Sequence, residues 1–336
     1  MKLLLLLIVL PWQLQAADLF KPVLAHPHGA LAPLDPKKSP DLNEILDRVS
    51  AALLGKKYQL GPLGEGDDAA HPLYRLDIFD CTTFLETVMA NAYCFSAGER
   101  RPDCLAKSMQ KIRYGGGQIS FLERNHIPEL DWLPHNVSHG FLEDLSTSFH
   151  PSEWHTALIT IDRDLWMASL GKTAKTKEPA PARTLAYLPV AHFFTKSQPD
   201  VLLADKFAAM EKEIAAKMAA PGISKDEREQ LTKEKFRVEM EFLKLEFVPL
   251  EDRLKEIPSG TVLNLVRAAV TDAAKAKLTP LISHQGLILQ KSDGPHIRHA
   301  AANVGHVSDQ RLADYLLRYV KSSNVRGISL YRILQK

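Results

Sequence analysis

Residues 79–86 read FDCTTFLE and bring a cysteine, Cys81, into the first turn of a predicted helix. Apolar residues follow at helical spacing: Phe84, Leu85, Val88, Met89 and Ala92. Thr83 and Glu86 form a predicted capping box, and Asp80 is a second candidate cap. Such a position lies near the positive end of the helix dipole and lowers a cysteine pKa from about 8.5 to roughly 3.5–7.5. Cys81 is therefore a candidate nucleophile, and the alternative is a small buried hydrophobic residue.

The N-terminus has the pattern of a secretory signal peptide. Lys2 precedes an apolar run at residues 3–10, and residues 13–17 offer small side chains for cleavage. The run is too short to span a bilayer comfortably, and no later segment is long and apolar enough to do so. We expect residues 1–17 to be removed and the mature protein to be periplasmic or secreted, without stable membrane insertion.

Composition and cysteine count narrow the class of protein further. The 336 residues carry a net charge of +2, and no Lys/Arg run is interleaved with aromatic residues, so nothing argues for a nucleic-acid partner. In an oxidising compartment, an odd number of cysteines leaves one thiol unpaired. Cys94 and Cys104 flank a polar loop that can close as a disulfide, which would leave Cys81 free. Two reduced cysteines are the alternative, because spacing alone does not fix the distance between them.

The rest of the chain divides into a leader and one domain. Residues 18–40 form a predicted extended Pro-rich leader, and residues 41–336 a single catalytic domain. Helices are predicted at 41–55, 81–92, 105–112, 204–220, 224–247 and 309–320, and strands at 156–161, 165–170, 191–195, 261–267, 281–290, 296–301 and 327–334. Residues 124–132 are predicted to form an irregular surface segment. The Lys- and Glu-rich residues 204–247 are interpreted as a solvated helical hairpin inserted in the domain. Helices first and antiparallel strands last favour an α+β fold.

A cysteine nucleophile needs a base and a third group that orients the base. His284 lies within a strongly apolar predicted strand, and Gly286, on the same face, leaves room for another group to approach. The alternative is a core histidine bonded to the backbone. In the following strand His296 and His299 face opposite ways, so only one of them can meet His284. Its apolar neighbours make His299 the inward one, and His296 is predicted to be exposed.

Three short motifs together resemble a known family. Residues 80–84 (DCTTF), 283–286 (SHQG) and 298–300 (RHA) are similar to the signature of NlpC-type papain-like cysteine hydrolases. They most resemble the branch described as N-acetylmuramoyl-L-alanine amidase-like, formerly a domain of unknown function. Residues 112–114 with Gly117, and residues 124–126 with Asp131 and Trp132, agree with that branch. The resemblance runs from about Tyr58 to the C-terminus.

The resemblance implies a papain-like NlpC-type core, with the nucleophile helix packed on an antiparallel sheet. It implies an enzyme that cuts an amide of peptidoglycan or muropeptides without a metal or other cofactor. By position, Cys81 would be the nucleophile, His284 the general acid/base, His299 the orienting residue, and Tyr58 a hydroxyl near the thiol. The chain departs from the family pattern at residues 127–128, where an aromatic pair is usual, and at residue 301, where serine is frequent.

Several alternatives stay open on the sequence alone. Arg124, Asp131 and Trp132 are candidate substrate contacts, or else a structural salt bridge with an aromatic plug. Within the enzyme class, a γ-D-glutamyl-diaminopimelate endopeptidase of the same fold is the alternative to the amidase. A zinc amidase would need three protein ligands, such as Cys81, His284 and His299, but the sequence has no His-Glu-x-x-His motif. A non-catalytic wall-binding protein is the last alternative.

Overall fold

The computed structural model describes residues 41–63, 73–99, 102–116, 119–172 and 183–335. The predicted signal peptide and leader (residues 1–40) and Gly117 lie outside these residues. The fold is built around a curled eight-stranded sheet in the order β2-β1-β11-β10-β9-β8-β12-β3, antiparallel except between β1 and β2. Its strands are β1 (Lys57–Tyr58), β2 (Ile78–Phe79), β3 (Leu142–Asp144), β8 (Thr261–Arg267), β9 (Ile282–Lys291), β10 (Gly294–Ala301), β11 (His306–Arg311) and β12 (Val325–Ile333). The predicted α+β class with an antiparallel sheet is confirmed.

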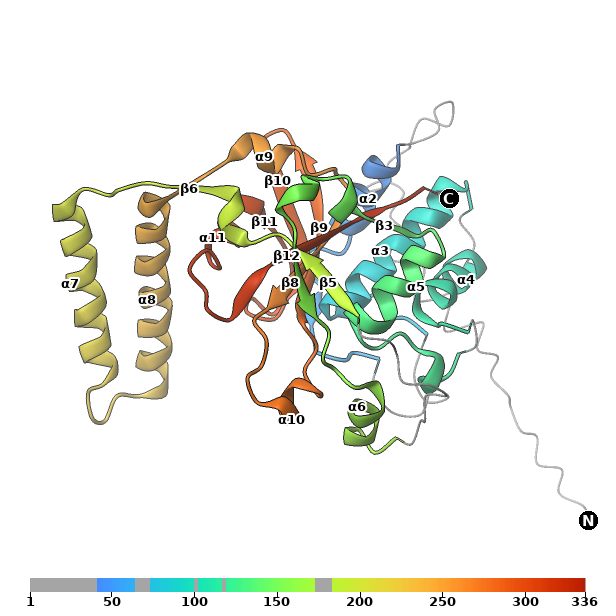
Figure 1. The fold of residues 1–336 in the computed structure, drawn as a ribbon, viewed down its shortest axis with the longest axis horizontal. Helices are drawn as coiled ribbons and strands as arrows, with labels where there is room; N and C mark the ends of the chain where they lie inside the picture. The colour runs from blue at the N-terminus through green and yellow to red at the C-terminus, as the bar shows by residue number, and fades with distance from the viewer. Residues whose placement is uncertain (1–40, 64–72, 100–101, 117–118, 173–182, 336) are drawn as a thin grey trace, which may run out of the picture.

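Alternating side chains divide the core between the two faces of the sheet. Val262 and Val266 of β8 join the core on one face, whereas Leu263 and Leu265 join the core on the other. The first face is covered by four helices, which lie together on one side of the sheet (Figure 1): α2 (Leu42–Ala51), α3 (Cys81–Ser96), α4 (Pro102–Arg113) and α5 (Leu133–Ser138). Helix α3 is buried along most of its length and packs against β9 and β10, so it forms the centre of this layer.

The second face is covered by shorter elements. They are the 3-10 turns η4 (Leu145–Thr147) and η6 (Val190–Phe193), and the helices α9 (Glu251–Lys255) and α11 (Leu312–Leu317). The hairpin of α7 (Val201–Met218) and α8 (Lys225–Glu246) projects from this side (Figure 1). Strands β6 (Phe194–Lys196) and β7 (Phe247–Pro249) pair at its base. Ser224 and Glu227 form the capping box of α8, and the predicted hairpin is thus observed.

The remaining elements lie at the edges of the two layers. They are the two-stranded sheet of β4 (His155–Leu158) and β5 (Thr184–Tyr187), the helices α6 (Arg163–Ser169) and α10 (Ala273–Ala276), the 3-10 turns η2 (Phe121–Glu123) and η5 (Pro151–Glu153), and the π-helical turn η3 (Pro128–Trp132). Cys94 of α3 and Cys104 of α4 form a disulfide, and Cys81 is the free cysteine. Among the described helices, none is long and apolar enough to cross a membrane.

Four predictions about local structure are wrong. Residues 165–170 are not a strand but part of α6, because Asp162 caps the backbone N–H groups of Asp164 and Leu165. Residues 306–311 pair with β10 as a strand, so the helix predicted at 309–320 is confined to α11. Of residues 191–195, only the last two belong to a strand. Segment 124–132, predicted to be irregular surface, contains the buried residues Asn125, Ile127, Glu129 and Trp132.

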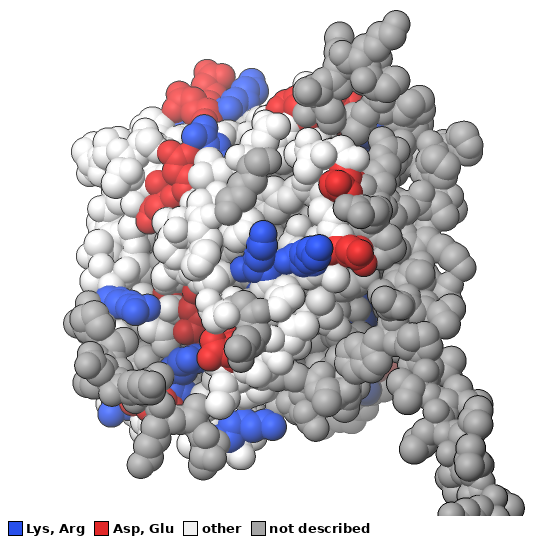
Figure 2. Space-filling view, turned by 90° about the vertical axis from the view of Figure 1, so that its right-hand side faces the viewer, with Lys and Arg blue, Asp and Glu red and all other residues white. Residues whose placement is uncertain are grey.

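The charged residues on the helical side of the molecule are scattered rather than gathered by sign. On the face turned to the viewer in Figure 2, Lys and Arg lie beside Asp and Glu over the coloured part of the surface. This distribution matches the near-neutral net charge of +2.

Candidate active site

Cys81 is the first residue of α3, and the residue before it fixes that position. Asp80 accepts a hydrogen bond from the backbone N–H of Thr83 (2.8 Å), while Thr83 Oγ1 accepts from the backbone N–H of Asp80 (3.0 Å). This reciprocal pair is the capping box of α3, so the predicted Thr83–Glu86 box is wrong. Asp80 also accepts from the backbone N–H of Gly61 (3.2 Å). The loop after β1 is thereby tied to the start of the cysteine helix.

Tyr58 lies beside this helix start, as the resemblance implies. It pairs with Phe79 in the parallel β1–β2 ladder, two residues before the cysteine. Burial, together with the negative charges of Asp80 and of the Cys81 thiolate, raises the pKa of Tyr58 to about 12. The phenol therefore keeps its proton at neutral pH and can act as a hydrogen-bond donor near the thiol.

His284 and His299 form a directly bonded pair on neighbouring strands. Nε2 of His284 lies 2.6 Å from Nδ1 of His299. Gly286 makes this approach possible, because a Cβ at that position would lie 2.7 Å from the Ile297 side chain and 3.2 Å from Cβ of His299. The predictions that His299 meets His284, and that Gly286 makes room on the same face, agree with this geometry.

The pair continues into β11 and α11 through residues that the sequence analysis missed. Nε2 of Gln310 lies 2.9 Å from Nε2 of His299, and Oε1 of Gln310 accepts a hydrogen bond from Arg318 (2.5 Å). The buried ring of Tyr315 lies edge-on to His299, with a centroid distance of 5.3 Å. Gln310, Tyr315 and Arg318 were missed because residues 309–320 were predicted to form one helix, so the strand that carries Gln310 was not recognised.

The prediction that His296 is exposed is wrong. Its side chain is 15% exposed and lies between Asp309 (2.5 Å) and Asp293 (3.1 Å). Lys291 and Arg298 also bond to Asp309. This ionic cluster on the face opposite His299 holds the β9–β10–β11 hairpins together.

Gln285 connects the cysteine helix to the histidine strand. Its Oε1 accepts a hydrogen bond from Thr82 (2.6 Å), and its Nε2 donates to Asn264 of β8 (2.8 Å). The backbone N–H of Gln285 also lies close enough to the Cys81 sulfur to favour its thiolate. In the described part of the chain, no hydrogen bond joins that sulfur directly to a histidine ring, and Thr82 Oγ1 lies 4.0 Å from it. Sulfur and imidazole are therefore neighbours through Gln285 rather than directly bonded partners.

The three titratable groups are neutral at physiological pH. Burial lowers the pKa of His284 to about 4. Burial, together with the positive charges of His284 and Arg318, lowers the pKa of His299 to about 3. Burial, together with the adjacent Asp80 carboxylate, raises the pKa of Cys81 to about 12. The expectation of a lowered thiol pKa is wrong, because desolvation and an adjacent anion outweigh the helix terminus.

Trp132 and Arg113, from the segments that agree with the family pattern, pack against Glu86 of α3. Trp132 is fully buried and donates from Nε1 to Oε1 of Glu86 (3.1 Å). Arg113 donates to the other oxygen of Glu86 (2.8 Å from Nε), and both side chains are buried. Trp132 thus has no surface to offer a ligand, and the structural alternative describes it better. Glu86, predicted as a cap, is the centre of this network.

Arg124 and Asp131 are partly exposed. Asp131 forms an ion pair with Arg163 (3.4 Å), and the carbonyl of Arg124 accepts from the same arginine (3.3 Å). Neither residue lines the cleft that contains the histidine pair. Their neighbour Glu129 is buried and accepts hydrogen bonds from the backbone N–H groups of Leu281 and Ile282, just before His284. The segment therefore supports the histidine strand from behind.

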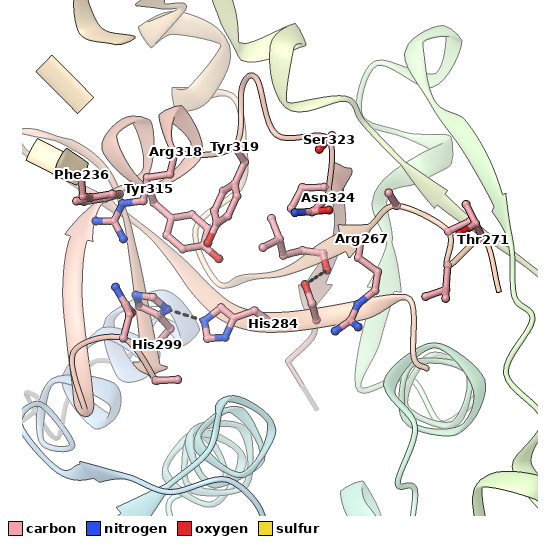
Figure 3. A pocket seen from close by; sticks show the side chains of 18 residues that line it. Phe236, Arg267, Thr271, His284, His299, Tyr315, Arg318, Tyr319, Ser323 and Asn324 are labelled. Carbon is pink, nitrogen blue, oxygen red and sulfur yellow. Dashed lines mark hydrogen bonds between the residues drawn. The ribbon is translucent and has the colours of Figure 1, made fainter. Parts of the chain in front are cut away.

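A cleft of 990 Å³ opens over the histidine pair (Figure 3). His284 and His299 lie on its floor, and Tyr315, Tyr319 and Arg318 form one wall. Cys81 is partly exposed but is not among the lining residues. In the described ranges, no group of three His, Cys, Asp or Glu side chains is arranged to hold a metal ion. His284 and His299 bond to each other instead of converging on a shared ion.

Residues 48–323 match the family described as AmiA-like, N-acetylmuramoyl-L-alanine amidase-like. The chain belongs to the AmiA-like family. No curated protein matches it significantly. Among solved structures, a Legionella pneumophila protein of family DUF1460 aligns over 96% of this chain and 95% of its own, with 21% identity and a TM-score of 0.64. An N-acetylmuramoyl-L-alanine amidase from Bacteroides uniformis aligns over 88% and 99%, with 18% identity and a TM-score of 0.52. These two structures show that the AmiA-like chain shares their fold.

Proposed function

We propose that this AmiA-like protein is a cysteine-type amide hydrolase of peptidoglycan or muropeptides, acting as an N-acetylmuramoyl-L-alanine amidase. The observation that supports this most is the 2.6 Å histidine pair, held on the strand whose next residue, Gln285, contacts the start of the cysteine helix. The name of the Bacteroides uniformis structure supports the choice of bond. The papain-like NlpC-type ancestry, and export through residues 1–17 to the periplasm or beyond, belong to the same proposal.

The proposed reaction begins from a neutral thiol and a neutral imidazole. His284 removes the proton of Cys81 as the sulfur attacks the amide carbonyl, because neither group is ionised beforehand. Nucleophile and base often lack their catalytic hydrogen bond in a ligand-free enzyme and approach each other in the substrate complex. In the reactive tautomer, His284 donates from Nε2 to Nδ1 of His299, so its own Nδ1 carries no hydrogen and can accept the thiol proton.

The backbone N–H of Cys81 and the protonated phenol of Tyr58 are the proposed donors to the oxyanion. Loss of one such donor typically costs about 3 kcal/mol of transition-state stabilisation. His284 then gives its proton to the leaving amine, and the C–N bond breaks to leave a thioester on Cys81. Water, deprotonated by His284, attacks the thioester and restores the thiol, so no redox step or co-reactant is required.

Mass spectrometry of a defined muropeptide digest tests this proposal. We expect a free sugar acid together with an intact peptide that begins with L-alanine. Cys81→Ala and His284→Ala should each abolish both products, whereas His155→Asn, at an exposed histidine on β4, should retain them. A sugar acid that still carries L-alanyl-D-glutamate, together with a released diaminopimelate fragment, would instead identify the γ-D-glutamyl-diaminopimelate endopeptidase. Binding without any product would identify a wall-binding protein.

A further inference from the structure

The cleft above the histidine pair is cationic. Its described lining includes two arginines, Arg267 and Arg318, but no aspartate or glutamate, and its two histidines are neutral at pH 7. Partly buried guanidinium groups are costly unless an anion or several acceptors pair with them. The two arginines therefore indicate what kind of ligand the cleft takes.

Arg267, at the end of β8, has a guanidinium that is not used by the residues the structure describes. Its Nε is buried without a hydrogen-bond partner, and its side chain makes no hydrogen bond to any described residue. The charge of Arg267 acts on Glu129. That carboxylate, however, already accepts from the backbone N–H groups of Leu281 and Ile282. Arg267 thus keeps its donors available to the cleft.

Arg318, which directly follows α11, is only partly used. One Nη donates to the amide oxygen of Gln310, and its guanidinium lies 5.6 Å from the ring centroid of Phe236 on α8. Its Nε is buried without a partner, and no carboxylate of a described residue forms an ion pair with it. Phe236 is 47% exposed and lines the same cleft, so the inserted hairpin forms part of the wall beside Arg318.

The strand order places these arginines on opposite sides of His284. Across the sheet the order is β11, β10, β9, β8. Arg318 is anchored to Gln310 of β11, His299 is on β10, His284 on β9 and Arg267 on β8. Figure 3 shows the same arrangement, with His284 between the two labelled arginines. A ligand centred on His284 therefore has a guanidinium available at each end.

We propose that Arg267 and Arg318 bind two carboxylates of one extended substrate, one on each side of His284. Guanidinium groups suit this role because their planar forks bind carboxylates in a bidentate manner. The substrate class is then a peptide acid with at least two free carboxylates, as the stem peptides of peptidoglycan are. That the two carboxylate sites flank a reacting centre rests on the proposed function. The preference of the cleft for a ligand with several carboxylates does not.

Binding to a non-hydrolysing protein tests this without catalysis. Isothermal titration of the full-length Cys81→Ala protein uses L-alanyl-γ-D-glutamyl-meso-diaminopimelate and the same peptide with its carboxylates amidated. We expect the free acid to bind at least about tenfold more tightly than the amide, because each charge-assisted hydrogen bond that is lost lowers the affinity by a factor of roughly 10 to 100. Arg267→Gln and Arg318→Gln should each remove most of this preference. Arg237→Gln, at an exposed arginine on α8, should leave it unchanged.

The outcomes separate this inference from the proposed function. Equal affinity for acid and amide, no binding of either, or a full preference in both arginine variants would overturn it. Thermal unfolding of each variant checks that a loss of binding is not a loss of fold, and Arg267→Lys should restore part of the preference by restoring the charge. If muropeptides are hydrolysed without such a preference, only this inference fails. If the preference appears but nothing is hydrolysed, only the proposed function fails.

Discussion

At the scale of single residues, the site combines a thiol and two imidazoles that are neutral at pH 7. Desolvation causes all three pKa shifts, with that of Cys81 at about 12 and that of His284 at about 4. This differs from a thiolate–imidazolium pair, in which the nucleophile is charged before the substrate arrives. The site should therefore be weakly reactive toward reagents that need a preformed thiolate.

The rate at which iodoacetamide alkylates Cys81 measures the reactivity of this thiol directly. Cys81 is the free cysteine, since Cys94 and Cys104 are joined. We expect its iodoacetamide rate constant to keep rising up to at least about pH 10, because a raised pKa moves thiolate formation to higher pH. A short thiol peptide alkylated in parallel should instead level off near about pH 9. A plateau below neutral pH for Cys81 would contradict the neutral resting state.

Gln310 offers a second test at this scale, because it contacts the outer nitrogen of His299. Gln310→Glu places a carboxylate against that ring and should raise the pKa of the histidine pair. The acid limb of the pH–activity profile should then move upward by about one unit. Gln310→Met, which removes the bond without adding charge, should lower kcat but leave the limb in place. The same profile in the Glu variant and in the parent enzyme would show that Gln310 does not orient the pair.

At the scale of elements, α3 is held by a buried network that is separate from the chemistry. Glu86 accepts from Arg113 and Trp132, and all three residues are at most 2% exposed. Arg113 and Trp132, which belong to segments that agree with the family pattern, therefore hold the cysteine helix in place and do not form a surface for substrate. A buried ion pair that loses one partner leaves an uncompensated charge in the core.

Replacing one partner of the buried Glu86–Arg113 ion pair should therefore destabilise the fold strongly. Glu86→Leu leaves the Arg113 guanidinium buried without its carboxylate, and we expect the free energy of unfolding to fall by about 3–5 kcal/mol. Arg332→Gln removes the exposed ion pair with Glu143 and should change the free energy of unfolding by less than about 1 kcal/mol. Urea unfolding compares the two. A similar small effect for both variants would contradict the structural role of the network.

Much of the element order could be predicted from local patterns, and the failures have physical causes. Ser224 with Glu227, and the apolar strands around His284, were predicted correctly because capping and periodicity act locally. Asp309 was misassigned to a helix, because its strand conformation depends on pairing with β10. Within the site, the meeting of His284 and His299 follows from alternation and Gly286. The roles of Gln310 and Tyr315 depend on tertiary packing that no local pattern records.

At the scale of the whole molecule, the histidine pair links protonation to folding. The folded pKa values of about 4 and about 3 lie below the ordinary value of 6.5. The unfolded chain therefore binds more protons below about pH 6.5, and stability falls as the pH drops from there toward about 4. Above about pH 6.5 the pair contributes no pH dependence. The sheet that carries both residues should thus become less stable in acid.

Equilibrium unfolding at several pH values checks this. A His284→Asn, His299→Gln double variant lacks both groups, so its stability should fall by roughly 4 kcal/mol less than that of the parent between pH 6.5 and 4.5, about 2 kcal/mol for each histidine. The His155→Asn variant, at an exposed site, should follow the parent. Identical pH dependence in the double variant and the parent would mean that the pair titrates normally.

The central claim is that the Cys81 sulfur attacks the carbonyl of a peptidoglycan amide. Acid quenching of the protein during turnover of a defined muropeptide, followed by mass spectrometry of the protein and of its peptides, tests this most directly. We predict a thioester adduct on the peptide that contains Cys81, with the mass of the sugar acid less one water. An adduct on another residue, or product formation that persists in Cys81→Ala, would contradict the account.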